Sequence, residues 1–127
     1  MGNCLGAEAG DEQQIQWRSG PGGMKICDTV VGKGHATPRK GTKVTVHYTG
    51  KLTNGKQFDS SVGKSPFVFT YGGGEVIKGW DMGLEGMKIG GTRELELPPE
   101  MGYGARGAPP DIPSNATLRF TIQMLKC

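Results

Sequence analysis

Short stretches of alternating apolar and polar residues, separated by glycine or proline, place the strongest limit on how this 127-residue chain can fold. An apolar period of two puts successive side chains on opposite faces of a β-strand, while glycine and proline supply the turns between strands. The 23 glycines and 8 prolines are therefore interpreted as turn residues and not as a low-complexity tract. A chain of this length is expected to build one hydrophobic core, and hence one domain.

Six segments carry the strand pattern. The clearest is Val44–Thr49, in which Val44, Val46 and Tyr48 share one face. The pair Asn54-Gly55 is a turn signal between this segment and the next. The predicted strands are residues 24–31, 44–49, 57–59, 67–71, 92–97 and 118–125.

One segment has helical spacing instead. From Glu75 to Met87 the apolar residues recur at intervals that place them on a single helix face. Gly79, Gly83 and Gly86 each lower helix stability by about 0.5–1 kcal/mol relative to alanine, so packing must hold the helix. The Trp80 indole is expected to supply that packing against the concave face of the strands. We therefore predict one short helix across a curved antiparallel sheet.

The chain divides at about residue 23. Residues 1–23 are rich in glycine and lack an apolar period, which indicates a flexible arm before a domain at 24–127. Gly2 and Cys4 stand where N-myristoylation and palmitoylation would give two membrane signals, although Gly6 replaces the serine or threonine of the motif. Acylation at Gly2 and Cys4 is one hypothesis, and an unmodified tail is the other.

The net charge limits the kinds of binding partner to expect, and the cysteine spacing bears on the cellular compartment. The net charge of +3 is spread over both signs without a basic block, so nucleic acid is not an expected partner. Cys4, Cys27 and Cys127 form no C-x-x-C pair, which favours free thiols and a reducing compartment. We expect a cytoplasmic protein that reaches a membrane only if it is acylated.

Several short motifs are interpreted as coincidence. Residues 102–107 match the pattern G-x-G-x-x-G, but prolines follow where a dinucleotide site needs a helix. Asn115-Ala116-Thr117 matches a glycosylation sequon in a chain without a recognisable secretion signal. His35 and His47 lack neighbours at metal-ligand spacing, so we expect no metal and no cofactor. No serine or cysteine has a persuasive activating base, which argues against covalent catalysis.

A longer set of motifs, spread along residues 24–126, resembles the successive signatures of the FKBP-type peptidyl-prolyl cis-trans isomerases. Order and spacing both match. The motifs are Val46–Gly50, Phe58–Ser61, Glu75–Asp81, Gly102–Ala105 and Ile112–Phe120. The resemblance implies an α+β fold, in which an antiparallel half-barrel of five or six strands wraps around one short helix.

The resemblance also implies the site. Trp80 would form the floor of an apolar pocket, and Tyr103 would donate a hydrogen bond to a substrate carbonyl, with the Ile77 N–H as a second donor. Asp59 would be costly in an apolar concavity unless Tyr48 bonds it, and an exposed turn aspartate is the alternative. The implied catalytic residues are Tyr48, Phe58, Asp59, Trp80, Tyr103 and Phe120. The implied substrate and macrolide contacts are Tyr48, Phe58, Asp59, Phe67, Glu75, Val76, Ile77, Trp80, Tyr103, Ile112 and Phe120.

The implied ligands are proline-containing peptides or protein clients and the macrolides tacrolimus and rapamycin. Two rim segments depart from the best-known small family members, namely Val62–Ser65, which is one residue shorter and lacks their arginine, and Pro110-Asp111. Recruitment of calcineurin or the rapamycin target kinase by a drug complex is therefore left open. A non-catalytic adaptor that holds a proline-bearing partner is the alternative function. A monomer is expected, because no exposed apolar stripe is evident.

Overall fold

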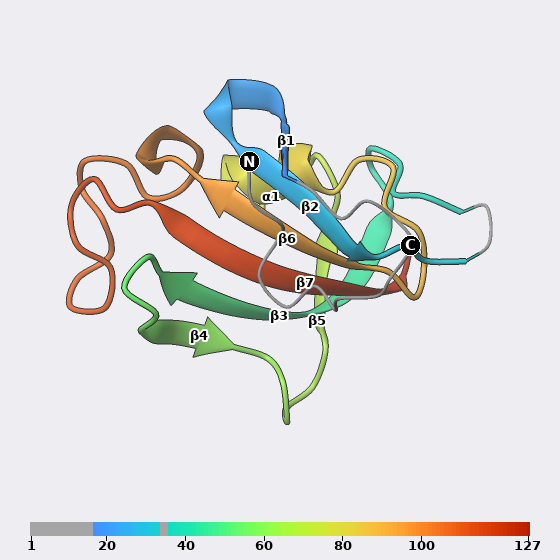
Figure 1. The fold of residues 1–127 in the computed structure, drawn as a ribbon. Coiled ribbons are helices and arrows are strands. Elements are labelled where there is room, and N and C mark those ends of the chain that lie inside the picture. Colours follow the sequence, from blue (N-terminus) through green and yellow to red (C-terminus); the bar gives the residue numbers. More distant parts are fainter. Residues whose placement is uncertain (1–16, 34–35) are drawn as a thin grey trace, which may run out of the picture.

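The computed structural model describes residues 17–33 and 36–127 (Figure 1). Seven antiparallel strands form one sheet in the order β1-β2-β6-β7-β3-β4, and β5 also pairs with β3. The strands are β1 Arg18–Ser19, β2 Lys25–Val30, β3 Lys43–Leu52, β4 Gln57–Ser60, β5 Phe67–Thr70, β6 Thr92–Leu97 and β7 Leu118–Lys126. One α-helix, α1 Lys78–Gly83, accompanies two short 3₁₀ turns, η1 Pro21–Gly23 and η2 Pro99–Met101.

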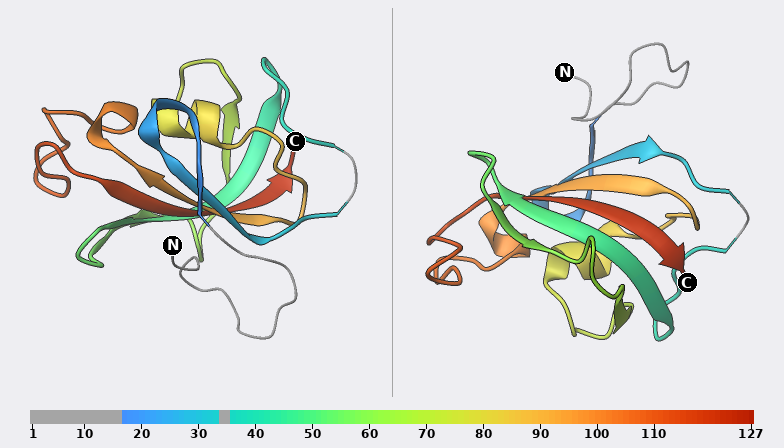
Figure 2. Two further views of the ribbon diagram at one scale, coloured as in Figure 1. Left: turned by 45° about the horizontal axis from the view of Figure 1, so that its top comes forward. Right: turned by 90° about the horizontal axis from the view of Figure 1, so that it is seen from below.

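The sheet curves around the helix. Figure 2 shows α1 on the concave side of the sheet, with the strands running past it. Along β6, Leu95 and Leu97 are fully buried, whereas Glu94 and Glu96 point to the other face. The alternation read from the sequence therefore decides which face of each strand meets the core. The predicted α+β fold, an antiparallel sheet wrapped around one short helix, is confirmed.

The helix is shorter than predicted. It covers Lys78–Gly83 and not the whole of Glu75–Met87. Ile77 has an extended backbone with ψ of 154°, and Gly86 has a φ of 77°, so both ends leave the helical conformation. The apolar spacing still has a packing role, because Leu84 and Met87 are buried beyond the helix end.

The described residues include part of the predicted arm, namely residues 17–23. Arg18 in β1 pairs with Ile26 in β2, and its guanidinium lies 3.1 Å from the Asp28 carboxylate. Within this segment, Arg18 and Ser19 form β1 and extend the sheet by one short strand. This strand explains why the sheet has seven strands and not the predicted five or six. The acylation hypothesis for Gly2 and Cys4 lies outside the described residues.

The expectation of free thiols is wrong for Cys27. This residue is fully buried and disulfide-bonded, whereas Cys127 is a free cysteine. Because Cys27 is disulfide-bonded, the cysteines do not indicate a reducing compartment. In the described part of the chain, no helix is both long and apolar enough to cross a membrane.

Candidate functional site

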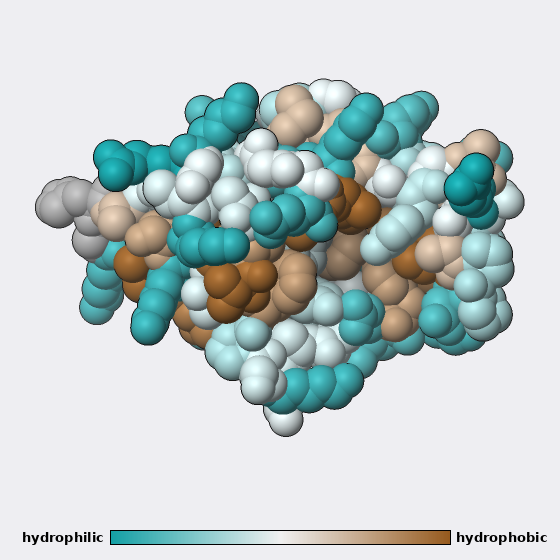
Figure 3. All heavy atoms as spheres, turned by 180° about the vertical axis from the view of Figure 1, so that it is seen from behind, coloured by the Kyte–Doolittle hydropathy of each residue, from teal (hydrophilic) through white to brown (hydrophobic). Residues whose placement is uncertain are grey.

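A pocket of about 460 Å³ opens beside the start of α1, between the sheet and two loops. Apolar side chains gather around a hollow on the face of the molecule that Figure 3 shows. The pocket is lined by Tyr48, Phe58, Asp59, Phe67, Glu75, Val76, Ile77, Trp80, Tyr103 and Phe120. Strands β3, β4, β5 and β7 and the segment leading into α1 therefore all contribute to one cavity.

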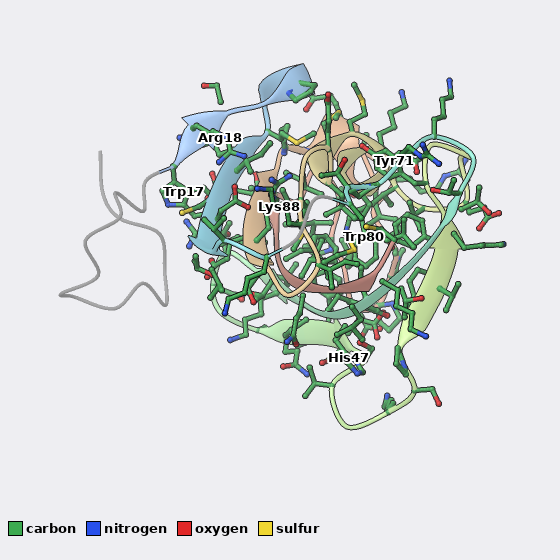
Figure 4. The ribbon with its side chains drawn as sticks, turned by 90° about the vertical axis from the view of Figure 1, so that its right-hand side faces the viewer. Trp17, Arg18, His47, Tyr71, Trp80 and Lys88 are labelled. Carbon is green, nitrogen blue, oxygen red and sulfur yellow. The ribbon has the colours of Figure 1, made fainter. Side chains whose placement is uncertain are left out.

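Trp80 closes the inner end of this pocket. Its side chain is only 4% exposed, and Figure 4 shows it in the interior of the molecule. Its ring centroid lies 5.0 Å from that of Tyr48 and 5.3 Å from that of Phe120, with interplanar angles of 75° and 86°. Such edge-to-face contacts hold aromatic rings in fixed orientations. The Trp80 Nε1 is buried and has no hydrogen-bond partner within the described residues.

Phe67 and Phe69 extend the aromatic cluster from β5. The Phe67 ring stands 5.9 Å from Trp80 at 77°, and it is 36% exposed at the pocket wall. Phe69 is buried behind it, 5.8 Å from Trp80 and stacked on Phe67 at 5.7 Å. Sequence reasoning missed Phe69 as a support of the floor, although the period of two places it on the same face as Phe67.

The polar side of the pocket is built on a bond between Tyr48 and Asp59. The Tyr48 hydroxyl donates to Asp59 Oδ2 at 2.7 Å, and the Ser60 N–H donates to Asp59 Oδ1 at 2.8 Å. Burial, and then the bond to Asp59, raise the pKa of Tyr48 to about 12. The predicted contact between Tyr48 and Asp59 is therefore present, although Asp59 itself is exposed on a strand.

Tyr103 lies across the pocket on the loop that follows η2. It is 41% exposed, and no hydrogen bond occupies its hydroxyl within the described residues. Burial and the nearby charge of Asp59 raise the pKa of Tyr103. A neutral hydroxyl at the mouth of an aromatic pocket is available to donate a hydrogen bond to a ligand.

The segment before α1 forms the remaining wall. Val76 and Ile77 are half-buried, and the Ile77 N–H makes no backbone hydrogen bond within the described residues. Glu75 Oε1 accepts a hydrogen bond from the Thr70 N–H at 2.9 Å, which lowers the pKa of Glu75. Ile77 therefore presents a backbone donor to the pocket edge from a segment that is tied back to β5.

Ile112 does not line this pocket. It is 4% exposed and exchanges backbone hydrogen bonds with Ala108 at 2.8 and 2.9 Å. Ile112 packs with the buried core beneath the long loop. Ile112 thus lies outside the lining of this cavity, where the other ten predicted contact residues meet, and its contact with a ligand stays a prediction.

A second depression of about 540 Å³ lies alongside and shares Phe58 and Asp59 with the aromatic pocket. Exposed Gln57, Val62 and Lys64 contribute to its lining, and it lacks an enclosed aromatic floor. Although it is larger, the depression offers an apolar ring less contact area than the pocket at Trp80. Within residues 17–33 and 36–127, no three His, Cys, Asp or Glu side chains are grouped to hold a metal.

Together these features define a class of protein: a small half-barrel with one aromatic pocket, sized for an apolar ring and edged by a few hydrogen-bonding groups. The family model FKBP_C, described as FKBP-type peptidyl-prolyl cis-trans isomerase, matches residues 34–125. The chain belongs to this isomerase family, as the sequence motifs implied.

Individual relatives agree with this assignment. FK506-binding protein 4 of Rhizopus delemar is 54% identical over 105 residues, which are 83% of this chain and 27% of that protein. Peptidyl-prolyl cis-trans isomerase FKBP2 of Mus musculus is 57% identical over 89 residues, which are 69% of this chain and 64% of that protein. The crystal structure of AtFKBP13 has a TM-score of 0.80 and 42% identity, covering 87% of this chain and 98% of that one. This chain thus spans about a quarter of the first of these relatives and under two thirds of the second.

Proposed function

We propose that this domain catalyses cis-trans isomerisation of X-Pro peptide bonds by binding the twisted amide in the pocket above Trp80. The observation that carries the proposal is the cavity of about 460 Å³, floored by a buried indole, with the Tyr103 hydroxyl and the Ile77 N–H unengaged at its edge. Family membership supports the same reaction. Proline-containing peptides and protein segments are the proposed substrates.

The physical task matches an apolar site. Rotation about a peptide bond is opposed by a barrier of about 18–20 kcal/mol, because resonance gives the C–N bond partial double-bond character. The twisted transition state loses this resonance, and with it part of the polarity of the carbonyl group. A pocket that excludes water therefore disfavours the planar amide more than the twisted one. Shape that fits the twisted geometry adds differential binding of the transition state.

The polar residues then orient the substrate. In this proposal Tyr103 and the Ile77 N–H donate hydrogen bonds to substrate carbonyls, and the rings of Phe58, Phe67 and Phe120 hold the proline. The raised pKa values of Tyr48 and Tyr103 keep both hydroxyls neutral at physiological pH. They act as hydrogen-bond donors and transfer no proton.

Binding of tacrolimus (FK506) and rapamycin in the same pocket is proposed as well. The name of the Rhizopus relative, FK506-binding protein 4, and the aromatic lining support it. Titration of each drug, followed by the fluorescence of the domain, should give saturable binding that Phe58→Ala weakens. Separate pull-downs with each drug would show whether calcineurin or the rapamycin target kinase is recruited.

The deciding experiment is the cis-to-trans relaxation of a short peptide with a hydrophobic residue before proline, with and without the protein. Acceleration that rapamycin abolishes is the expected result. Tight drug binding without acceleration would instead favour the adaptor function, in which the pocket only holds a proline-bearing partner. Failure of both would overturn the assignment of the pocket.

Cytoplasmic location, a monomeric state and acylation at Gly2 and Cys4 stay predictions from the sequence. Light scattering during size-exclusion chromatography measures the oligomeric state. The intact mass of protein isolated from its native cell shows whether acyl groups are present.

A further inference from the structure

The connection from β5 to α1 contains three consecutive glycines and carries one wall of the pocket. Gly72 and Gly74 have φ values of 72° and 75°, a conformation that glycine adopts without the steric cost of a side chain. Glycine also loses more conformational freedom than any other residue when it is fixed. Val76 and Ile77 follow this run after the single residue Glu75, so their placement depends on how firmly the glycines are held.

Asp81 holds this run from the first turn of the helix. Its Oδ1 accepts a hydrogen bond from the Gly72 N–H at 2.9 Å, and its Oδ2 accepts one from the Gly74 N–H at 2.9 Å. Asp81 directly follows Trp80 in α1. The same turn of helix therefore supplies the pocket floor and fixes the segment that leads to the pocket wall.

We infer that Asp81 is a positioning residue of the pocket, which acts through the glycine run to hold the Ile77 N–H at the geometry that ligands need. The inference rests on the proposed function, because it assigns Ile77 a role in binding substrate and macrolide. Asp81 itself does not line the cavity and touches no ligand in this account.

A carboxylate suits this role because both of its oxygens accept hydrogen bonds and both bonds are charge-assisted. An asparagine of the same shape keeps one acceptor oxygen and turns an NH₂ group toward the second backbone N–H. Asp81→Asn therefore breaks one of the two bonds while leaving the volume of the side chain nearly unchanged. The glycine run then samples additional conformations, and only the fraction with Ile77 in place binds ligand at full strength.

The matched control is Glu85→Gln. Glu85 lies four residues further along the same segment, and its side chain is exposed and makes no hydrogen bond within the described residues. Both substitutions remove one negative charge, so a difference between them reports the two bonds of Asp81 and not net charge. Asp81→Glu restores two acceptor oxygens and should recover part of the lost binding.

The first test is steady-state kinetics on a proline peptide. A reduced competent fraction weakens ground state and transition state alike, so KM should rise about tenfold while kcat stays within about twofold. The Kd for rapamycin should rise by a similar factor in Asp81→Asn and stay unchanged in Glu85→Gln. Equal KM and Kd values for the two variants would overturn the inference. Loss of kcat in step with loss of folded protein would show a merely structural role and would overturn it too.

Amide hydrogen exchange separates this inference from the proposed function. In the wild-type protein the Gly72 and Gly74 amides should be protected from exchange. In Asp81→Asn at least one of these amides should exchange at least tenfold faster. In Glu85→Gln both should exchange at the wild-type rate. If the wild-type protein lacks isomerase activity but shows this pattern and a drug Kd that depends on Asp81, the proposed catalysis fails while the positioning role stands. Unprotected glycine amides in the wild-type protein would contradict the positioning role whatever the activity.

Discussion

The Tyr48 hydroxyl donates a hydrogen bond of 2.7 Å to Asp59 Oδ2, which joins neighbouring strands β3 and β4 at the edge of the aromatic pocket. The bond directs the Asp59 carboxylate and holds the Tyr48 ring, whose centroid lies 5.0 Å from that of Trp80. The polar edge and the apolar floor of the pocket are thus coupled through one tyrosine.

This bond predicts how stability falls in alkali. Because the pKa of Tyr48 is raised from 10.0 to about 12 in the folded state, the neutral form is favoured by folding. Its contribution to stability is complete below pH 10 and is lost as the pH rises through 12. Tyr48→Phe cannot ionise, so the variant should lose less stability than the wild-type protein between pH 10 and 12. Denaturant unfolding at several pH values measures this difference, and parallel decline of the two proteins would contradict the assignment.

The division of roles between donors and rings predicts unequal losses of activity. Tyr103→Phe removes one hydrogen bond and should lower kcat/KM roughly tenfold, at about 1.4 kcal/mol per factor of ten. Phe58→Ala removes a pocket ring, which lies 5.6 Å from Phe120, and should lower it further. A coupled isomerase assay on variants verified as folded makes the comparison. Equal losses, or a larger loss in Tyr103→Phe, would count against the division.

The helix packs too closely on β6 for a side chain at Gly79. A Cβ built there would overlap the end of the buried Leu97 side chain. Alanine gains about 0.8–1.0 kcal/mol of helix propensity over glycine, but overpacking in a core costs about 1–3 kcal/mol. Gly79→Ala should therefore be net destabilising, whereas Lys78→Ala at an exposed position should change stability by under about 0.5 kcal/mol. Urea unfolding measures both, and a more stable Gly79→Ala would show that the helix can shift.

The Glu94 carboxyl, on the outer face of the sheet, predicts that stability also depends on pH in the acid range. Burial raises the pKa of Glu94, and the charges of Arg119 and Lys51 only partly offset that effect. A raised pKa means that this residue favours folding most at low pH and that the contribution declines as the pH rises through the folded value. Glu94→Gln stays neutral, so its melting temperature relative to wild type should be higher at pH 7 than at pH 4. An identical difference at both pH values would contradict the assignment.

The sequence predicted most of the sheet because strand burial follows a period of two. The bounds of Thr92–Leu97 were predicted to the residue, since polar and buried positions alternate without interruption. The length of the helix was overestimated because the residues on either side of it also place apolar side chains against the core at helix-like intervals. The family resemblance implied eleven contact residues, and ten of them line the pocket. Periodicity alone could not have distinguished these residues from the core.

What the sequence could not predict depends on contacts between distant segments. Asp81 is an ordinary helix-surface aspartate by spacing, and only the folded loop brings two glycine amides to its oxygens. Ile112 lies between Tyr103 and Phe120 along the chain, yet the turn that pairs it with Ala108 directs it into the core. The disulfide at Cys27 has no spacing motif that would have indicated it.

The central claim is that the pocket above Trp80 accelerates rotation of the X-Pro bond, and two adjacent residues of β5 offer a matched pair to test it. Phe67 lines the pocket, whereas Val68 is 52% exposed and does not contribute to its lining. The measurement is the cis-to-trans relaxation rate of a hydrophobic X-Pro peptide against protein concentration. The account predicts a steep rise for the wild-type protein and Val68→Ala and a slope at least about tenfold lower for folded Phe67→Ala. A flat line for the wild-type protein, or equal slopes for the two variants, would contradict it.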